Sequence, residues 1–260
     1  MARRDRPTPI LWQFRYSHFN EKARWALDFK AIPHVRRSVL PGFHMLPMYW
    51  LSGQSAMPVL QLGGRTIADS TAIIAALEEQ YPEPPLYPRN ARQRERALAL
   101  EEYFDEHLGP QLRLAWFFET LPASDFAAAQ LTAGADTFTQ RSFRVAFPFV
   151  REAMKLKMGL NAESAKAARD EVVTALDRLE AEIQPSGYLV GDHFTVADLT
   201  AAALLSPVVM PHEFPYPLLR DLPESAARYR TSLARRTGFR WAADIYRRHR
   251  GQSHEVAAAR

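Results

Sequence analysis

The proline-dense stretch Tyr81–Pro88, "YPEPPLYP", constrains the fold of this chain more than any other feature. Proline lacks the backbone N–H that a helix requires, so the stretch is expected to be a stiff, extended connection. The hydrophobic pattern differs on its two sides. Residues 8–83 alternate short apolar runs with helical patterns, whereas residues 90–248 are helical in pattern nearly throughout. The sequence therefore predicts two domains that meet at the prolines.

The first domain is predicted to mix strands and helices. "ILWQF" and "HVRRSVL" are typical of strands, and helical spacing of apolar residues predicts helices over 20–30 and 70–80. "HMLPMYWLS" is expected to form a short, irregular helix. The apolar runs on either side of Gly63-Gly64 predict a hairpin. The resulting order, strand, helix, strand, helix, hairpin and helix, is that of a thioredoxin-like domain.

The second domain is predicted to be a helical bundle, which makes the fold class α/β plus all-α. Apolar residues at positions 172, 176, 179 and 183 repeat with helical spacing. In "GDHFTVADL", Thr195 and Asp198 have the spacing of a capping box, which predicts the start of a helix.

Composition excludes several classes of function. The 260 residues include no cysteine, which excludes thiolate nucleophiles, disulfide exchange and thiolate metal sites. The net charge of +4 comes mostly from arginines interspersed with acids, so no nucleic-acid partner is expected. Apolar runs are too short for a membrane span or a secretory leader, and we expect a cytoplasmic protein without a membrane partner. No HExxH motif, phosphate loop or dinucleotide fingerprint is present, so no metal site is expected.

Three short stretches are candidates for a binding site, and each has a structural alternative. Ser17 precedes the first helix, where serine is usually an N-cap. Met57-Pro58 opens a strand, and either a cis bond that turns the Met57 backbone toward a ligand or an ordinary trans bond suits that place. Asp69-Ser70 precedes the third helix, where both residues can cap or can receive charged groups of a ligand.

Taken in order, these motifs resemble the cytosolic glutathione transferase superfamily. "SHFNEKARWAL" is similar to the family's first helix, "MPVL" to its cis-proline strand, "ADSTAI" to its acid-serine pair and "GDHFTVADL" to its C-terminal capping motif. The resemblance runs from about Pro9 to Phe239. It is similar to a bacterial branch that has cysteine where this chain has Asn20, and His18 replaces the proline common after the catalytic position.

The resemblance implies a site for glutathione as co-substrate. Ser17 matches the residue that holds the glutathione sulfur in serine-type members, and Tyr16 is the rival donor. The peptide part of glutathione would be bound by Met57, Pro58, Asp69, Ser70, Gln54 and His44. The wall of a pocket for a small hydrophobic electrophile would be formed by Tyr103, His107, Arg113, Trp116 and Phe117, although such aromatic residues are more often core residues.

The function implied is a glutathione transferase that activates the thiolate for attack on the electrophile, as in detoxification, and that forms a homodimer. The alternative is a glutathione- or ligand-binding protein of the same fold without catalysis. A third reading is another glutathione-dependent enzyme, such as a dehalogenase or an isomerase.

Overall fold

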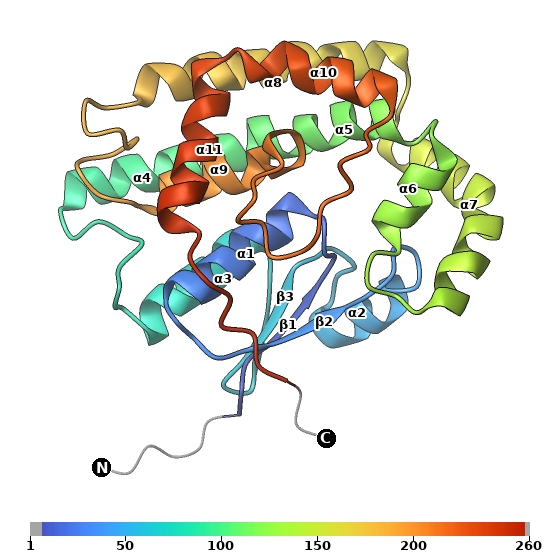
Figure 1. The fold of residues 1–260 in the computed structure, drawn as a ribbon. Coiled ribbons are helices and arrows are strands. Elements are labelled where there is room, and N and C mark those ends of the chain that lie inside the picture. The colour runs from blue at the N-terminus through green and yellow to red at the C-terminus, as the bar shows by residue number, and fades with distance from the viewer. Residues whose placement is uncertain (1–6, 258–260) are drawn as a thin grey trace.

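The computed structural model describes residues 7–257, and its sheet lies entirely in the first third of the chain (Figure 1). The sheet has the strand order β2-β1-β3-β4, with β1 parallel to β2 and antiparallel to β3. β3 and β4 form the predicted hairpin around Gly63-Gly64. The elements of this part are β1 (Ile10–Gln13), α1 (His18–Phe29), β2 (Val35–Ser38), α2 (Met45–Ser52), β3 (Val59–Leu62), β4 (Arg65–Ala68) and α3 (Ser70–Gln80).

Beyond the proline-dense stretch, the described chain is built from helices. These are α4 (Ala91–Tyr103), a π-helical turn η1 (Phe104–Leu108), α5 (Gly109–Thr120), α6 (Ser124–Leu131), α7 (Thr137–Met158), α8 (Ala162–Glu182), α9 (Val196–Val209), α10 (Glu224–Ala234) and α11 (Thr237–His249). The fold is thus a thioredoxin-like α/β part followed by a helical part, as the sequence predicts.

The two parts share one hydrophobic core. α1 and α3 lie between the sheet and the helices, and α1 packs on α9 (Figure 1). α9 is buried on nearly all sides, because its sequence is almost wholly apolar, and the capping box starts it: Asp198 accepts from Thr195 N and Thr195 Oγ1, both at 2.9 Å. The core therefore runs without a break from Leu11 of the sheet to Leu205 of α9.

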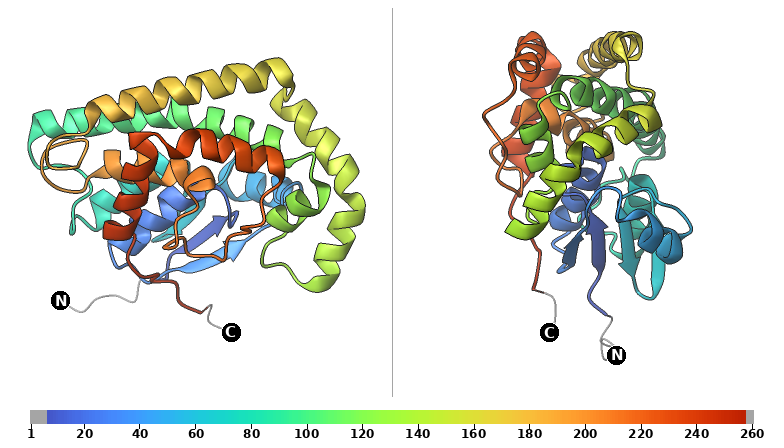
Figure 2. Two further views of the ribbon diagram at one scale, coloured as in Figure 1. Left: turned by 45° about the horizontal axis from the view of Figure 1, so that its top comes forward. Right: turned by 90° about the vertical axis from the view of Figure 1, so that its right-hand side faces the viewer.

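α6 and α7 form an arm beside the main body. The arm extends from the helical part down toward the level of the sheet (Figure 2). It has a small core of its own, which includes Leu121, Phe143 and Phe147. The arm thus forms a wall that faces the sheet part across the space near α2.

Two segments return from the helical part to the sheet part, which the sequence did not predict. The loop between α9 and α10 brings Tyr216 to Gln13, whose side-chain amide donates to the Tyr216 hydroxyl. After α11, the chain runs along the edge of the sheet, where His34 N donates to His254 O and Val256 N donates to His34 O. The termini of the described chain therefore lie on the same side of the molecule (Figure 1).

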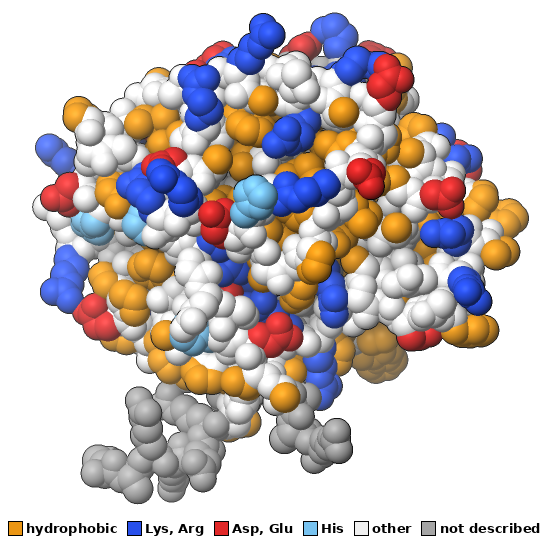
Figure 3. All heavy atoms as spheres, in the orientation of Figure 1, with side chains coloured by type: hydrophobic (Ala, Val, Ile, Leu, Met, Phe, Trp, Pro, Cys, Tyr) orange, Lys and Arg blue, Asp and Glu red, His pale blue; other side chains and the backbone are white. Residues whose placement is uncertain are grey.

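The surface shows no single charged zone on the face drawn in Figure 3, where Lys and Arg are interspersed with Asp and Glu. Among the described residues, no helix combines the length and the apolar character that crossing a bilayer requires.

Candidate functional site

Ser17 lies at the junction between β1 and α1. It is the N-cap of α1, with extended backbone angles, and its Oγ accepts from Asn20 N at 3.5 Å. That distance is at the limit of a hydrogen bond. A hydroxyl has one hydrogen to donate as well as lone pairs to accept. The weak cap therefore leaves the hydroxyl hydrogen of Ser17 available to a second partner.

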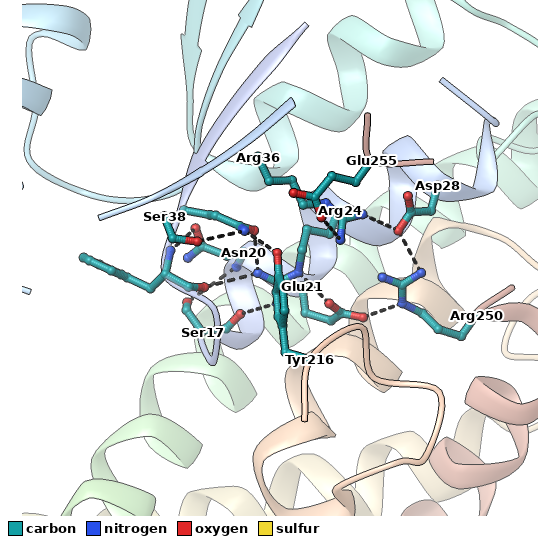
Figure 4. A network of polar contacts seen from close by, with 12 residues as sticks. Ser17, Asn20, Glu21, Arg24, Asp28, Arg36, Ser38, Tyr216, Arg250 and Glu255 are labelled. Atoms are coloured by element: carbon teal, nitrogen blue, oxygen red, sulfur yellow. Dashed lines mark hydrogen bonds and ion pairs between the residues drawn. The ribbon is translucent and has the colours of Figure 1, made fainter. Parts of the chain in front are cut away.

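Two buried polar side chains hold the loop that carries Ser17 (Figure 4). Asn20 Oδ1 accepts from Phe14 N at 3.2 Å. Arg24, fully buried, donates to the carbonyl oxygens of Phe14 at 3.2 Å and Ser17 at 3.4 Å, and to Gln13 Oε1 at 2.8 Å. Because one guanidinium binds two carbonyl groups of the loop and the last side chain of β1, the position of Ser17 depends on Arg24. Nothing in the local sequence around Asn20 and Arg24 indicates this role.

Tyr16, the rival donor, is engaged elsewhere. Its hydroxyl donates to the carbonyl oxygen of Pro217, in the loop between α9 and α10. Burial raises the pKa of the Tyr16 phenol above its usual value, in spite of the nearby Arg15 charge. The phenol hydrogen is therefore bound within the protein.

The other two candidate stretches, Met57-Pro58 and Asp69-Ser70, lie immediately before β3 and at the start of α3. The Met57-Pro58 bond is cis, and Met57 borders the same cavity as Ser17. Asp69 has a φ of 80° and caps α3, where its Oδ1 accepts from Thr71 N at 2.9 Å and Ala72 N at 3.1 Å. Ser70 is buried at the first turn of α3.

A cavity of about 1000 Å³ opens beside Ser17, between the sheet part, α5 and the arm. Of the sequence-predicted residues, it is bordered by Tyr16, Ser17, His44, Met57, Arg113, Trp116 and Phe117. Its other lining residues are mostly apolar and come from α5, α7 and the loops of the sheet part, with smaller contributions from α1, α2, α6 and α9. Gln54 does not border it; its carbonyl oxygen accepts from Ser52 Oγ instead.

Tyr103 and His107, expected in this wall, do not border the cavity. Tyr103 and His107 stack on each other at 4.7 Å, and His107 Nδ1 lies 2.8 Å from Glu171 Oε1 of α8. The π-helical turn is the physical reason. It inserts an extra residue per turn between α4 and α5, so residues before it and after it do not share the face that a regular helix predicts.

His18 is a cavity residue that the sequence analysis did not predict. It is buried, it borders the cavity, and within residues 7–257 its Nε2 has no hydrogen-bond partner. Burial, together with the Arg113 charge, lowers the pKa of His18 to about 3. The imidazole is therefore neutral at physiological pH. A buried histidine with a missing partner is the signal that identifies it, and only the structure provides that signal.

A second, acidic hollow of about 530 Å³ lies at the start of α3. Asp69 and Thr71 border it together with Glu101, Glu102, Asp105 and Glu106. Buried Lys22 neutralises part of this charge, since its Nζ lies 2.8 Å from Glu101 Oε1 and also contacts Asp105. Among the described residues, no group of three His, Asp or Glu side chains is arranged to hold a metal ion.

Comparison with known proteins agrees with this architecture. The family model for the glutathione S-transferase N-terminal domain matches residues 11–85, and the model for the glutathione S-transferase C-terminal domain matches residues 162–231. Together they match more than half of the chain.

Individual relatives are more distant. A maleylpyruvate isomerase from Ralstonia sp. is 34% identical over 48% of this chain and 61% of the relative. Glutathione S-transferase 1 from Dianthus caryophyllus is 32% identical over 41% of this chain and 57% of that relative. The chain thus spans less than two thirds of either relative.

Among solved structures, the holo structure of a maleylpyruvate isomerase, described as a bacterial glutathione S-transferase of the Zeta class, has a TM-score of 0.55. It is 22% identical, with 91% of this chain and 97% of that chain covered. That likeness concerns the fold alone. Because both domain models match in their expected order on this fold, the chain belongs to the glutathione S-transferase superfamily.

Proposed function

We propose that the protein is a glutathione transferase that activates the thiol of glutathione at Ser17 for attack on an apolar electrophile. The observation that carries the proposal is the placement of the Ser17 hydroxyl at the N-terminus of α1, on the border of a large, mostly apolar cavity. A helix N-terminus and a hydroxyl donor both favour an anion. A cavity of this kind suits a hydrophobic co-substrate.

The thiolate is the reactive form of glutathione. A free thiol has a pKa of about 8.5, so most of it is protonated at pH 7. Lowering that pKa by about two units requires about 2.7 kcal/mol, which a charge-assisted hydrogen bond and the helix dipole supply together. The proton leaves to solvent, and the sulfur then attacks the electrophilic carbon of the second substrate.

Ser17 is favoured over Tyr16 as the donor. Among residues 7–257, the Ser17 hydroxyl makes only the weak contact with Asn20 N, whereas the Tyr16 hydroxyl donates to Pro217 O. A thiolate bound by Tyr16 would have to displace that carbonyl. This supports the register in which Ser17 is the catalytic residue.

The peptide part of glutathione is proposed to lie along Met57, Asp69 and Ser70. The free backbone groups of Met57 would pair with the cysteinyl unit, and the acidic hollow next to Asp69 would suit the ammonium group of the γ-glutamyl unit. His44, which borders the cavity, is proposed to bind the glycyl carboxylate, with Gln54 as a weaker candidate.

A glutathione-dependent isomerase is the second candidate function. The specific observation in its favour is the relative that is named a maleylpyruvate isomerase. Such an enzyme would use the same thiolate and would differ in the groups that the cavity presents to the second substrate.

The proposal includes a homodimer. Sedimentation equilibrium at micromolar concentration tests this, and a mass of 29.6 kDa at all concentrations would argue against a dimer.

The function is tested by two measurements on the same preparation. Calorimetric titration with glutathione measures binding, and conjugation of chlorodinitrobenzene, followed by absorbance, measures transfer. Binding with conjugation is the expected result. Binding without conjugation of a panel of electrophiles would favour a carrier, and conversion of a cis to a trans double bond without a net product of conjugation would favour the isomerase.

A further inference from the structure

The large cavity is positively charged. Arg15, Arg113 and Lys157 border it, and no Asp or Glu from residues 7–257 does. An apolar cavity gains nothing from uncompensated cations, because charge is costly to remove from water. The charge of the lining therefore carries information about the ligand.

Two of the three cations have other roles. Arg15 lies over the ring of Tyr216 at 5.0 Å, and its Nε donates to Ser38 Oγ at 3.4 Å. Lys157 lies near the C-terminal end of α7, where it is exposed. Both have alternatives to a ligand, namely an aromatic ring for Arg15 and bulk water for Lys157.

Arg113 is exposed like Lys157, but unlike Arg15 it has no partner within the protein among residues 7–257. It projects from α5, and in the part of the chain that the structure describes it forms no hydrogen bond, no ion pair and no cation–π contact. Partial desolvation beside the cavity wall lowers the pKa of its guanidinium, although the side chain keeps solvent-accessible surface. This exposed residue borders the cavity. A guanidinium in such a place is suited to bind an anion through two hydrogen bonds.

His18 reinforces this assignment. Its Nε2 is buried without a partner, and the Arg113 charge contributes to the lowered pKa of its ring, so the two groups are neighbours. Because His18 is neutral, it can offer a hydrogen bond to a ligand without adding a second charge. Two polar groups without a partner among the described residues thus lie near each other on the border of a mostly apolar cavity.

The walls indicate the rest of the ligand. Trp116 and Phe117 follow Arg113 on α5, and Val150 and Met154 face them from α7. These side chains suit an aromatic or branched aliphatic body. We propose that the second substrate is an apolar molecule with one anionic group, a carboxylate or a sulfonate, and that Arg113 binds this group and determines specificity. That the ligand is a substrate rests on the proposed transferase function. The anion site itself does not depend on catalysis.

Binding is tested first with two dyes that share the same ring system. Anilinonaphthalene sulfonate is anionic, and phenylnaphthylamine lacks the sulfonate. The dissociation constant of the sulfonate is expected to rise about ten- to a hundredfold in Arg113→Met, and that of the neutral dye at least fivefold less. Arg113→Lys should restore part of the difference because it keeps the charge and loses the bidentate geometry. Arg92→Met, an exposed position on α4 outside the cavity, is the matched control and should change neither dye.

The reaction is tested with chloronitrobenzoate and its methyl ester. The glutathione sulfur forms a bond to the ring carbon that bears chlorine, and chloride leaves with the bonding electrons. In Arg113→Met, kcat/KM is expected to fall about ten- to a hundredfold for the benzoate and at least fivefold less for the ester, with the effect in KM.

The outcomes separate the two proposals. Equal losses for both dyes and both electrophiles, or a tenfold rise in the KM for glutathione itself, would overturn the role of Arg113. Dye selectivity without conjugation of either electrophile would support the anion site and overturn the transferase. Normal conjugation of the ester without dye selectivity would support the transferase and overturn the anion site.

Discussion

Arg250 and Glu21 are in direct contact although 229 positions separate them in the chain. Arg250 Nε lies 2.5 Å from Glu21 Oε1, and its Nη1 lies 2.9 Å from Asp28 Oδ2 (Figure 4). All three side chains are buried. Glu21 and Asp28 are seven residues, about two turns, apart on α1, so both face the C-terminal segment.

This contact continues toward the candidate site. Glu21 also binds Arg24 Nε at 2.8 Å, and Arg24 holds the carbonyl oxygens of Phe14 and Ser17. A chain of charge-assisted hydrogen bonds therefore connects the segment after α11 to the loop of Ser17. Buried networks of this kind require every member to be paired, because a single missing partner leaves a desolvated charge.

We expect Arg250→Met to destabilise the protein by about 3 to 5 kcal/mol. The substitution keeps most of the side-chain volume but leaves Glu21 and Asp28 buried with one cation fewer. Urea denaturation measures the change in the free energy of unfolding. Arg247→Met is the matched control, since Arg247 lies three residues earlier on α11, is 72% exposed and among the described residues pairs with Asp244 alone. A loss below about 1 kcal/mol in Arg250→Met, equal to that of the control, would contradict the buried network.

His34 is expected to make stability depend on pH. It is buried beside the first residue of β2, its Nε2 accepts from Arg36 Nε at 2.9 Å, and its Nδ1 therefore carries the proton and donates to Ile32 O. Burial, aided by the Arg36 charge, lowers the pKa of His34 to about 4. In the unfolded chain the pKa is about 6.5, so the unfolded state takes up the proton first as the pH falls.

The contribution of His34 is fully present above about pH 6.5 and is lost as the pH falls toward 4, by about 1.4 kcal/mol per pH unit. Urea denaturation at several pH values in this window measures the slope for the wild type and for His34→Gln. In His34→Gln, the slope of the unfolding free energy against pH should be smaller by the contribution of one proton, about 1.4 kcal/mol per pH unit, whatever the stability of the variant at pH 7. His18 adds a slope of the same sign, which should persist in the variant. An unchanged slope would show that another group titrates.

The order of elements in the first 80 residues could be predicted because its signals are local. Gly63-Gly64 sits between two apolar runs and forms the hairpin turn, and Ser70–Gln80 forms the helix that its apolar spacing predicts. The resemblance also implies that Ser17 and Met57 share one site, and both residues border the same cavity.

The rest of the site depends on contacts between distant residues. The charged residues of "EKAR" are typical of a solvated helix face, yet Glu21, Lys22 and Arg24 are fully buried because α1 lies between the sheet and α9. Arg250 stands in a basic run that nothing local connects with α1. The π-helical turn was equally hidden, and it separates Tyr103 and His107 from the cavity that Arg113 borders.

Gly134 is expected to control the position of Arg15. A Cβ atom at Gly134 would lie 1.9 Å from Arg15 Cζ, so Gly134→Ala must displace the guanidinium. Gly64→Ala is a close control, because Gly64 has φ of 83° against 82° for Gly134 and nothing lies within 4 Å of its Cβ position. Both variants should lose about 1 to 2 kcal/mol from the unfavourable φ. Only Gly134→Ala should change the affinity of the cavity for the sulfonate dye, and equal affinities would contradict the prediction.

Ser17→Ala should separate the binding of glutathione from its ionisation. Met57, Asp69 and Ser70 are proposed to hold the peptide part, so the dissociation constant should change little. The pKa of the bound thiol should rise, because the thiolate loses a hydroxyl donor while the thiol loses little. One charge-assisted hydrogen bond contributes about 1.5 to 3 kcal/mol, so the conjugation rate at neutral pH should fall about ten- to a hundredfold.

The rate of Ser17→Ala should recover in part at higher pH, where the thiol ionises without help. Ultraviolet absorbance of the bound thiolate against pH measures this directly in the wild type, Ser17→Ala and Tyr16→Phe. Tyr16→Phe is the matched control, because it removes a hydroxyl that the Pro217 carbonyl already binds and should leave the titration in place. A titration that moves in Tyr16→Phe and stays in Ser17→Ala would make Tyr16 the donor. A titration that moves in neither would leave Ser17 as a helix cap and favour a binding protein without catalysis.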